Sequence, residues 1–185
     1  MQQPVRACVK IGGFGGQGVV LASIILGRAA ILDGKYSTQV ASYGSESRGG
    51  ECQAEVIISK DPIGYPHADR VHTLIVMSEP ALSKYLGDLL PGGTLLADPD
   101  MVKILPDRKD INILKIVAAK TADTLGRRIV ENMVMLGALQ AWTKIISEES
   151  LFTAVREYVP TQTVEINVRA AREGMKMTSR IRRTR

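Results

Sequence analysis

A run of glycines near the start of the chain has the spacing of an anion-binding turn. Positions 13 to 18 read Gly-Phe-Gly-Gly-Gln-Gly and fit the pattern Gly-x-Gly-x-x-Gly. A strand-like segment precedes them and a helix-like segment follows, so free backbone N–H groups and the helix dipole would favour a phosphate or a carboxylate there. We therefore predict an anion site formed by Gly13, Gly15, Gly16, Gln17 and Gly18. The alternative is a tight turn whose glycines only let helix and strand pack closely.

Two specific nucleotide sites do not fit this turn. A Walker loop has lysine and then serine or threonine at the end of its glycine pattern, whereas Val19 and Val20 follow Gly18. A dinucleotide-binding fold has an acidic residue for the ribose at the end of its second strand, and the predicted second strand, residues 36–42, ends without one. We therefore expect neither ATP hydrolysis nor NAD binding at this turn.

A second candidate binding segment is the bend at residues 43–50, which is rich in glycine and serine. An arginine in such a bend can bind a carboxylate or a phosphate through two parallel N–H groups. The candidate residues of this loop are Ser45, Glu46, Arg48, Gly49 and Gly50. The alternative is a solvated hairpin loop, because turns rich in glycine and serine need no function.

Nothing else in the sequence has the pattern of a catalytic or metal site. His67 and His72 flank a loop that has no cysteine or acidic cluster at ligand spacing, and no serine has the surroundings of a nucleophile elbow. Glu79 and Asp98 could lie at the carboxyl ends of strands, where open α/β sheets bind ligands, but both positions suit helix caps equally well. We predict a binding surface with no catalytic residue and no metal site of its own.

The chain that carries these segments alternates strands and helices. Runs of β-favouring residues predict strands at residues 5–11, 36–42, 52–59, 72–77, 94–97 and 111–118. Apolar residues at helical spacing predict helices at residues 19–32, 79–90, 129–146, 148–158 and 167–177. The helix at 129–146 is apolar nearly all round, which fits burial in the core or, alternatively, a subunit interface. This order predicts a three-layer α/β/α Rossmann-like sandwich with a mixed, mostly parallel sheet and a helical C-terminal part.

Length and composition favour a single domain over residues 1–185, with a basic tail at 178–185. Four arginines of the last six residues supply most of the net charge of +5, and aromatic residues are few, so we expect no nucleic-acid binding. No window reaches the roughly 20 apolar residues of a membrane span, and the first residues lack the features of a signal peptide. We expect a cytoplasmic protein without membrane contact. Cys8 and Cys52 are too far apart in sequence for a Cys-x-x-Cys site, which argues against an iron–sulfur cluster in this chain alone.

The glycine turn and the Arg48 loop together resemble, in order and spacing, the gamma subunit of the 2-oxoacid:ferredoxin oxidoreductases. Residues 58–59, 90–93 and 132–138 extend the resemblance, which covers about residues 8 to 175. The tyrosine before the Arg-Gly-Gly sequence looks most like the 2-oxoglutarate branch, with pyruvate, branched-chain oxoacid and indolepyruvate enzymes as relatives. Ser45 and Ser47 stand where members of that branch often have proline and methionine.

The resemblance implies a non-catalytic subunit of a hetero-oligomer. Alpha, beta and delta-type subunits would hold thiamine diphosphate and the iron–sulfur clusters, convert the 2-oxoacid, above all 2-oxoglutarate, to an acyl-coenzyme A, and pass electrons to ferredoxin. This chain alone would bind no cofactor. Because a helix N-terminus and a guanidinium group both suit phosphate or carboxylate, we expect its two glycine-rich loops to lie toward the active-site cleft of the complex, where they help to bind coenzyme A or close the site. Two alternatives stay open: the loops only contact other subunits, or the chain is a free-standing Rossmann-like nucleotide-binding protein.

Overall fold

The computed structural model describes residues 6–43 and 50–183, without the side chains of residues 180–183. Its strands form one six-stranded sheet with the order β2-β3-β1-β4-β5-β6. They are β1 (Arg6–Phe14), β2 (Tyr36–Tyr43), β3 (Glu51–Ser59), β4 (Val71–Val76), β5 (Leu89–Ala97) and β6 (Asn112–Lys115). Neighbours from β1 through β4 and β5 to β6 are parallel, whereas β3 runs antiparallel to both β1 and β2. The prediction of a mixed, mostly parallel sheet is confirmed.

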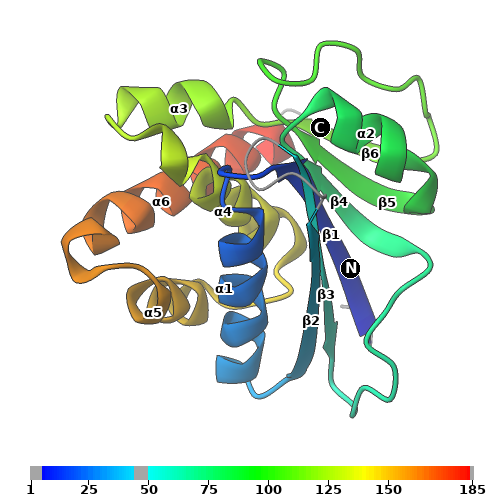
Figure 1. Cartoon of the computed structure of the whole chain (residues 1–185), viewed down its shortest axis with the longest axis horizontal. Coiled ribbons are helices and arrows are strands. Elements are labelled where there is room, and N and C mark those ends of the chain that lie inside the picture. The colour runs from blue at the N-terminus through cyan, green and yellow to red at the C-terminus, as the bar shows by residue number, and fades with distance from the viewer. Residues whose placement is uncertain (1–5, 44–49, 184–185) are drawn as a thin grey trace.

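Helices cover both faces of the sheet, but unequally (Figure 1). They are α1 (Val19–Leu32), α2 (Glu79–Tyr85), α3 (Ala118–Thr124), α4 (Glu131–Thr143), α5 (Glu148–Tyr158) and α6 (Val164–Arg183). In Figure 1, α2 lies on one face, and α1 and α4 lie on the other with α5 and α6 outside them. This is the predicted three-layer arrangement. None of the helices within the described ranges is long and apolar enough to cross a membrane.

Alternation along β1 divides the apolar residues between the two faces. Ala7, Val9 and Ile11 belong to the larger cluster with α1 and α4, and Cys8 belongs to the smaller one with α2. Cys52 on β3 joins the larger cluster, so the two cysteines lie on opposite faces of the sheet. Both thiols are free and buried, and burial raises the pKa of each. The two sulfur atoms therefore cannot ligate one cluster together.

The apolar helix predicted at residues 129–146 forms the centre of the larger cluster. It begins at Glu131, after a short 3-10 turn at Arg128–Val130, and nearly all of its length is buried. It crosses α6 in direct backbone contact, because a Cβ atom on Gly137 would lie 1.8 Å from the carbonyl oxygen of Ala171. The core position is thus confirmed for this helix.

Several predicted element ends differ from the structure, and the error near Leu89 comes from a tertiary contact. The helix predicted to reach Leu90 ends at Tyr85, and Leu89 to Gly93 open β5 instead, because Leu89 pairs with Val71 and is fully buried. The strand predicted at 111–118 ends at Lys115, after which α3 begins.

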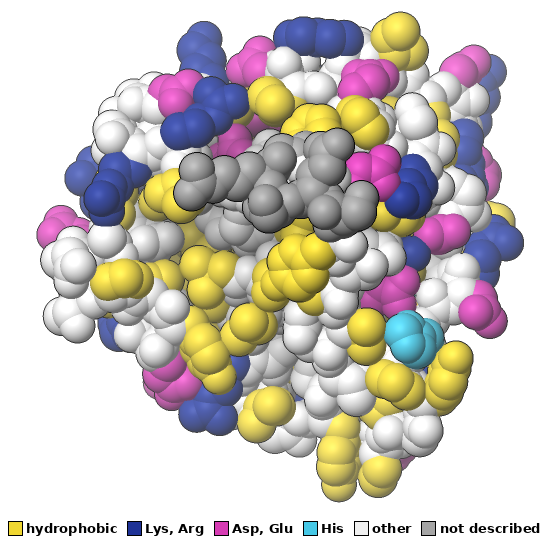
Figure 2. Space-filling view, in the orientation of Figure 1, with side chains coloured by type: hydrophobic (Ala, Val, Ile, Leu, Met, Phe, Trp, Pro, Cys, Tyr) yellow, Lys and Arg dark blue, Asp and Glu magenta, His cyan; other side chains and the backbone are white. Residues whose placement is uncertain are grey.

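The last helix is longer at both ends than predicted. Residues 178–183 of the predicted basic tail continue α6, where Thr178 is buried and its hydroxyl donates to the carbonyl oxygen of Ala138 at 3.2 Å. In Figure 2, Lys and Arg side chains are spread among Asp and Glu over the face shown rather than gathered in one patch.

Candidate functional site

The glycine turn lies at the topological switch point of the sheet, between β1 and β4. It follows β1, whose carboxyl end adjoins that of the parallel strand β4. The helix after β1 packs on one face of the sheet and the helix after β4 on the other (Figure 1). In open α/β sheets, the crevice outside the carboxyl ends of two such strands is the usual place for a ligand. The predicted glycine site therefore occupies the position that this architecture favours for binding.

The turn directs the N-terminus of α1 toward this crevice. Gly16 and Gly18 have φ angles of 99° and 73°, a left-handed conformation that favours glycine. Gly18 is the N-cap residue, and no side chain that the structure describes caps the helix there. The first N–H groups of a helix have no partner within it and carry the positive end of its dipole. Gly16 is exposed, and a Cβ atom on it would meet no atom of the described residues within 4 Å.

Gln17 braces the turn against β4. Its Oε1 accepts a hydrogen bond from the backbone N–H of Phe14 at 2.7 Å, and its Nε2 donates to the carbonyl oxygen of Met77 at 2.9 Å. A Cβ atom on Gly13 would lie 2.6 Å from this Oε1, so Gly13 leaves the space that the amide occupies. The bonds of Gln17 within the chain thus explain why glycine stands at position 13.

The structure brings one end of the second predicted loop to the glycine turn. The backbone N–H of Gly15 donates to the carbonyl oxygen of Gly50 at 2.9 Å. Antiparallel pairing of Phe14 with Glu51 and of Tyr43 with Cys52 places the β2–β3 connection at the same end of the sheet as the turn. Of the predicted loop residues, Ser45, Glu46, Arg48 and Gly49 lie outside the described residues.

The start of α4 forms the buried side of the turn. Asn132 donates from Nδ2 to the carbonyl oxygen of Gly18 at 3.0 Å. Glu131 is buried, and burial raises the pKa of its carboxyl group although hydrogen bonds from Gln17 and Arg128 oppose the rise. The separation between Arg128 Nε and Glu131 Oε2 is 3.1 Å. No sequence pattern pointed to a role for these residues. Only Asn132 carried a signal, because it lies in the segment 132–138 of the family resemblance.

The structure separates the two carboxylates. Asp98, directly after β5, bonds the start of α3, whereas α2 is capped by Ser78, which accepts from the N–H of Ala81 at 3.4 Å, and not by Glu79. Asp98 is fully buried, and its carboxylate accepts from the backbone N–H of Ala119 at 2.6 Å and of Asp100 at 2.9 Å, which caps α3. Burial raises the pKa of this carboxyl group against the effect of those bonds. Glu79 lies in the first turn of α2 and accepts from the N–H of Lys103 at 2.9 Å.

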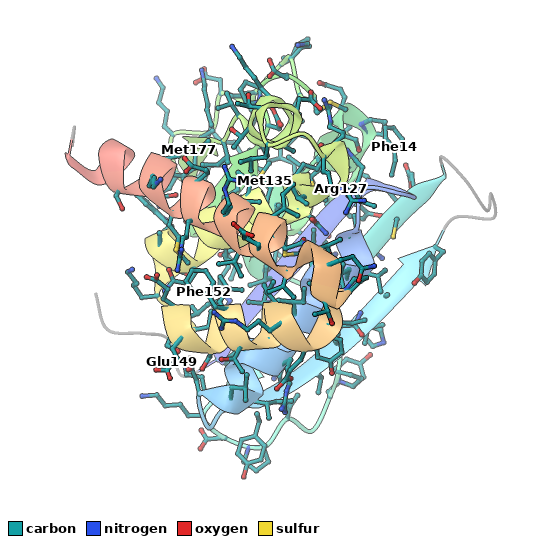
Figure 3. All side chains as sticks on the ribbon, turned by 90° about the vertical axis from the view of Figure 1, so that its left-hand side faces the viewer. Phe14, Arg127, Met135, Glu149, Phe152 and Met177 are labelled. Atoms are coloured by element: carbon teal, nitrogen blue, oxygen red, sulfur yellow. The ribbon has the colours of Figure 1, made fainter. Side chains whose placement is uncertain are left out.

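The two histidines lie at the opposite end of the sheet from the turn. His72 accepts at Nδ1 from the backbone N–H of Cys8 at 3.1 Å, and burial together with the charge of Arg6 lowers its pKa. The described residues contain no group of three or more His, Cys, Asp or Glu side chains placed to hold a metal ion. Phe14 and Arg127, by contrast, lie toward the end of the molecule that carries the turn (Figure 3).

The chain is an α/β sandwich in which the glycine turn and the adjoining β2–β3 connection lie at the end of the sheet where open α/β folds usually bind ligands. The family model for pyruvate ferredoxin/flavodoxin oxidoreductases matches residues 8–177. The chain belongs to this family.

Relatives of nearly the same length confirm the resemblance to gamma subunits. The 2-oxoglutarate synthase subunit KorC of Methanothermobacter marburgensis is 43% identical over 180 residues, which cover 94% of this chain and 97% of the relative. The KorC subunit of Methanocaldococcus jannaschii is 40% identical, with 96% of each chain covered. The crystal structure of a keto/oxoacid ferredoxin oxidoreductase gamma subunit from Geobacter sulfurreducens superposes with a TM-score of 0.83 at 37% identity and covers 94% of this chain and 98% of that one.

Proposed function

We propose that the chain is the gamma subunit of a complex that oxidatively decarboxylates 2-oxoglutarate, joins the acyl group to coenzyme A and transfers the electrons to ferredoxin. The observation that carries this proposal is the similarity to KorC subunits at 40–43% identity over nearly the whole of both chains. Because the similarity reaches from end to end, the match concerns the subunit as a unit rather than a shared nucleotide-binding segment.

Within that complex, we propose that the glycine turn and the Arg48 loop form one wall of the coenzyme A site. The support is the open helix N-terminus at the switch point, together with the bond from Gly15 to Gly50 that joins the two segments. A helix N-terminus and a guanidinium group both suit the phosphate groups of coenzyme A. The proposed wall consists of Gly13, Gly15, Gly16, Gln17, Gly18, Ser45, Glu46, Arg48, Gly49 and Gly50.

We propose that the chemistry belongs to the other subunits. Alpha, beta and delta-type chains would hold thiamine diphosphate and the iron–sulfur clusters and would deliver electrons to ferredoxin. The placement of Cys8 and Cys52 on opposite faces of the sheet supports this division, since an iron–sulfur cluster takes several cysteine ligands at one point. This chain would contribute assembly and part of the coenzyme A site.

The subunit assignment is tested by affinity purification of the chain from its native cells. We expect three or more companion chains, bound thiamine diphosphate and iron, and coenzyme A-dependent reduction of ferredoxin that is faster with 2-oxoglutarate than with pyruvate. A solitary, colourless chain that binds ADP or NAD in calorimetry would refute the proposal and favour the free-standing nucleotide-binding alternative.

The coenzyme A wall is tested in the reconstituted complex with Arg48→Ala and Gly16→Asp. Arg48→Ala removes one charge-assisted bond, and Gly16→Asp places a carboxylate on the exposed side of the turn. Each should raise the KM for coenzyme A about tenfold or more with little change in kcat.

Two substitutions at the other end of the sheet serve as matched controls for the coenzyme A wall. Gly34→Asp also changes a glycine of positive φ, 74°, that has nothing within 4 Å of its Cβ position. Arg70→Ala removes an exposed arginine just before β4. Unchanged kinetics of an intact complex in all four variants would refute the wall. Dissociation on a sizing column in Arg48→Ala and Gly16→Asp alone would show that the loops contact other subunits instead.

A further inference from the structure

The first residues of α4 contact the glycine turn from the side that faces the core. Asn132, which is 2% exposed, donates from Nδ2 to the carbonyl oxygen of Gly18 at 3.0 Å. Its Oδ1 accepts from the backbone N–H of Met133 at 2.8 Å, which fixes the orientation of the amide. A Cβ atom on Gly18 would lie 2.2 Å from Nδ2, so no other residue type fits at position 18 while Asn132 keeps this place.

Glu131 reaches the same turn through a different residue. Glu131 is 4% exposed, and the nearby amide of Gln17 lowers its pKa against the effect of burial. That amide joins the N–H of Phe14 to the carbonyl oxygen of Met77. Arg128 holds the carboxylate from the other side, with 3.1 Å between Nε and Oε2. Adjacent residues of α4 thus lie against Gln17 and Gly18, the last two residues of the glycine pattern.

Such support matters because glycines lose more conformational freedom on ordering than other residues. Gly16 is exposed and meets no described residue within 4 Å of its Cβ position, so none of the described side chains holds it from outside. If the turn became ordered only when the ligand bound, the entropy cost of ordering it would weaken the affinity for the ligand. Support from the buried side avoids this loss.

We infer that Glu131 and Asn132 are positioning residues of the glycine turn. Neither touches the ligand of the proposed function. Asn132 fixes Gly18, the N-cap of α1, and Glu131 fixes Gln17, so that the N–H groups of the turn keep one orientation toward the phosphate. The inference rests on the proposed function for the identity of that ligand, but the order of the turn can be measured without it.

The test uses Asn132→Ala in the full chain and in the reconstituted complex, with Asn167→Ala as the matched control. Asn167 is also buried, and its Nδ2 also donates to a backbone carbonyl oxygen, that of Thr163 at 2.8 Å. In the full chain, hydrogen exchange of the amides at residues 13–22 should become about tenfold faster in Asn132→Ala and stay unchanged in Asn167→Ala. In the complex, the KM for coenzyme A should rise about tenfold in Asn132→Ala only, with kcat unchanged.

A second pair of variants separates positioning from general stability. Glu131→Gln keeps a group that can hydrogen-bond Gln17 and should keep a low KM for coenzyme A, whereas Glu131→Ala should raise it. Unchanged exchange of the turn in Asn132→Ala, or equal acceleration in Asn167→Ala, would overturn the inference. Faster exchange with an unchanged KM in every variant, including Arg48→Ala, would leave the positioning role standing and refute the coenzyme A wall.

Discussion

Replacement of Gly137 by alanine tests how firmly α4 is fixed by its crossing with α6. The Cβ atom would lie 1.8 Å from the carbonyl oxygen of Ala171, whereas ordinary contact begins at 3.4 Å. The atom in the way belongs to the backbone, so a change of rotamer cannot relieve the overlap. The two helices must move apart along the crossing, which also affects the buried side chains around it.

Two opposing effects decide the size of this change. Alanine in a helix interior is more favourable than glycine by about 1 kcal/mol. Overpacking of a close-packed core costs about 1–3 kcal/mol, and an overlap with rigid backbone belongs at or above the upper end. We therefore expect Gly137→Ala to lower the free energy of unfolding by about 2 kcal/mol and the Tm by roughly 4–8 °C in a chain of this size.

The matched control is Gly27→Ala in the middle of α1. There the nearest atom is the hydroxyl oxygen of Ser37 at 3.2 Å, which can rotate away. Gly27→Ala should thus be neutral or stabilising by up to about 1 kcal/mol, because only the helix preference of alanine changes. Urea unfolding followed by far-ultraviolet circular dichroism gives both values. Equal stability of the two variants would refute the inference that a backbone contact determines the crossing.

Two further predictions concern groups with shifted pKa values. Burial lowers the pKa of His72 from its usual 6.5, so on acidification the unfolded chain takes up a proton there before the folded chain does. The contribution of His72 to the free energy of unfolding should therefore be complete above about pH 6.5 and should fall below it. His72→Gln should flatten this pH dependence in urea unfolding between about pH 5 and 8. Although burial acts against it, hydrogen bonds from Ser150 and Ser147 hold the pKa of Asp33 below its usual 3.8. Asp33→Ala should therefore lower the free energy of unfolding by about 2 kcal/mol at pH 7, and this difference should shrink as the pH falls below about 3.8. A difference that stays constant with pH would contradict the ionic role of Asp33.

The parts of the fold that rest on local pattern could be predicted from the sequence. The helix after the glycine turn has the predicted bounds, because a run of small and branched apolar residues follows directly on Gly18. The β2–β3 hairpin and the buried strand at β4 also follow from neighbouring residues. The position of the turn at the end of β1 can be predicted from the order of a strand, a run of glycines and a helix along the sequence.

The contacts that complete the site could not be predicted, because they join distant parts of the chain. Asn132 and Gly18 are 114 positions apart, and no local pattern links an amide on one helix to a carbonyl oxygen in a turn. One neighbour of β1 was equally hidden. On the side away from β4 it is the antiparallel strand β3, so the end of β2 is not beside β1 as it is in a dinucleotide-binding fold. The missing acidic residue at the end of β2 is therefore weaker evidence against NAD binding than the sequence alone suggested.

The long separation between Gly18 and Asn132 has a consequence for the order in which the molecule is completed. During synthesis the glycine turn leaves the ribosome well before α4 exists, and α4 in turn needs α6 for its crossing at Gly137. Contacts of such high sequence separation also cost loop-closure entropy before they contribute stability. We therefore expect the turn to take its final shape only when the chain is finished, so that partner subunits meet an ordered site on complete chains and a loose glycine loop on truncated ones.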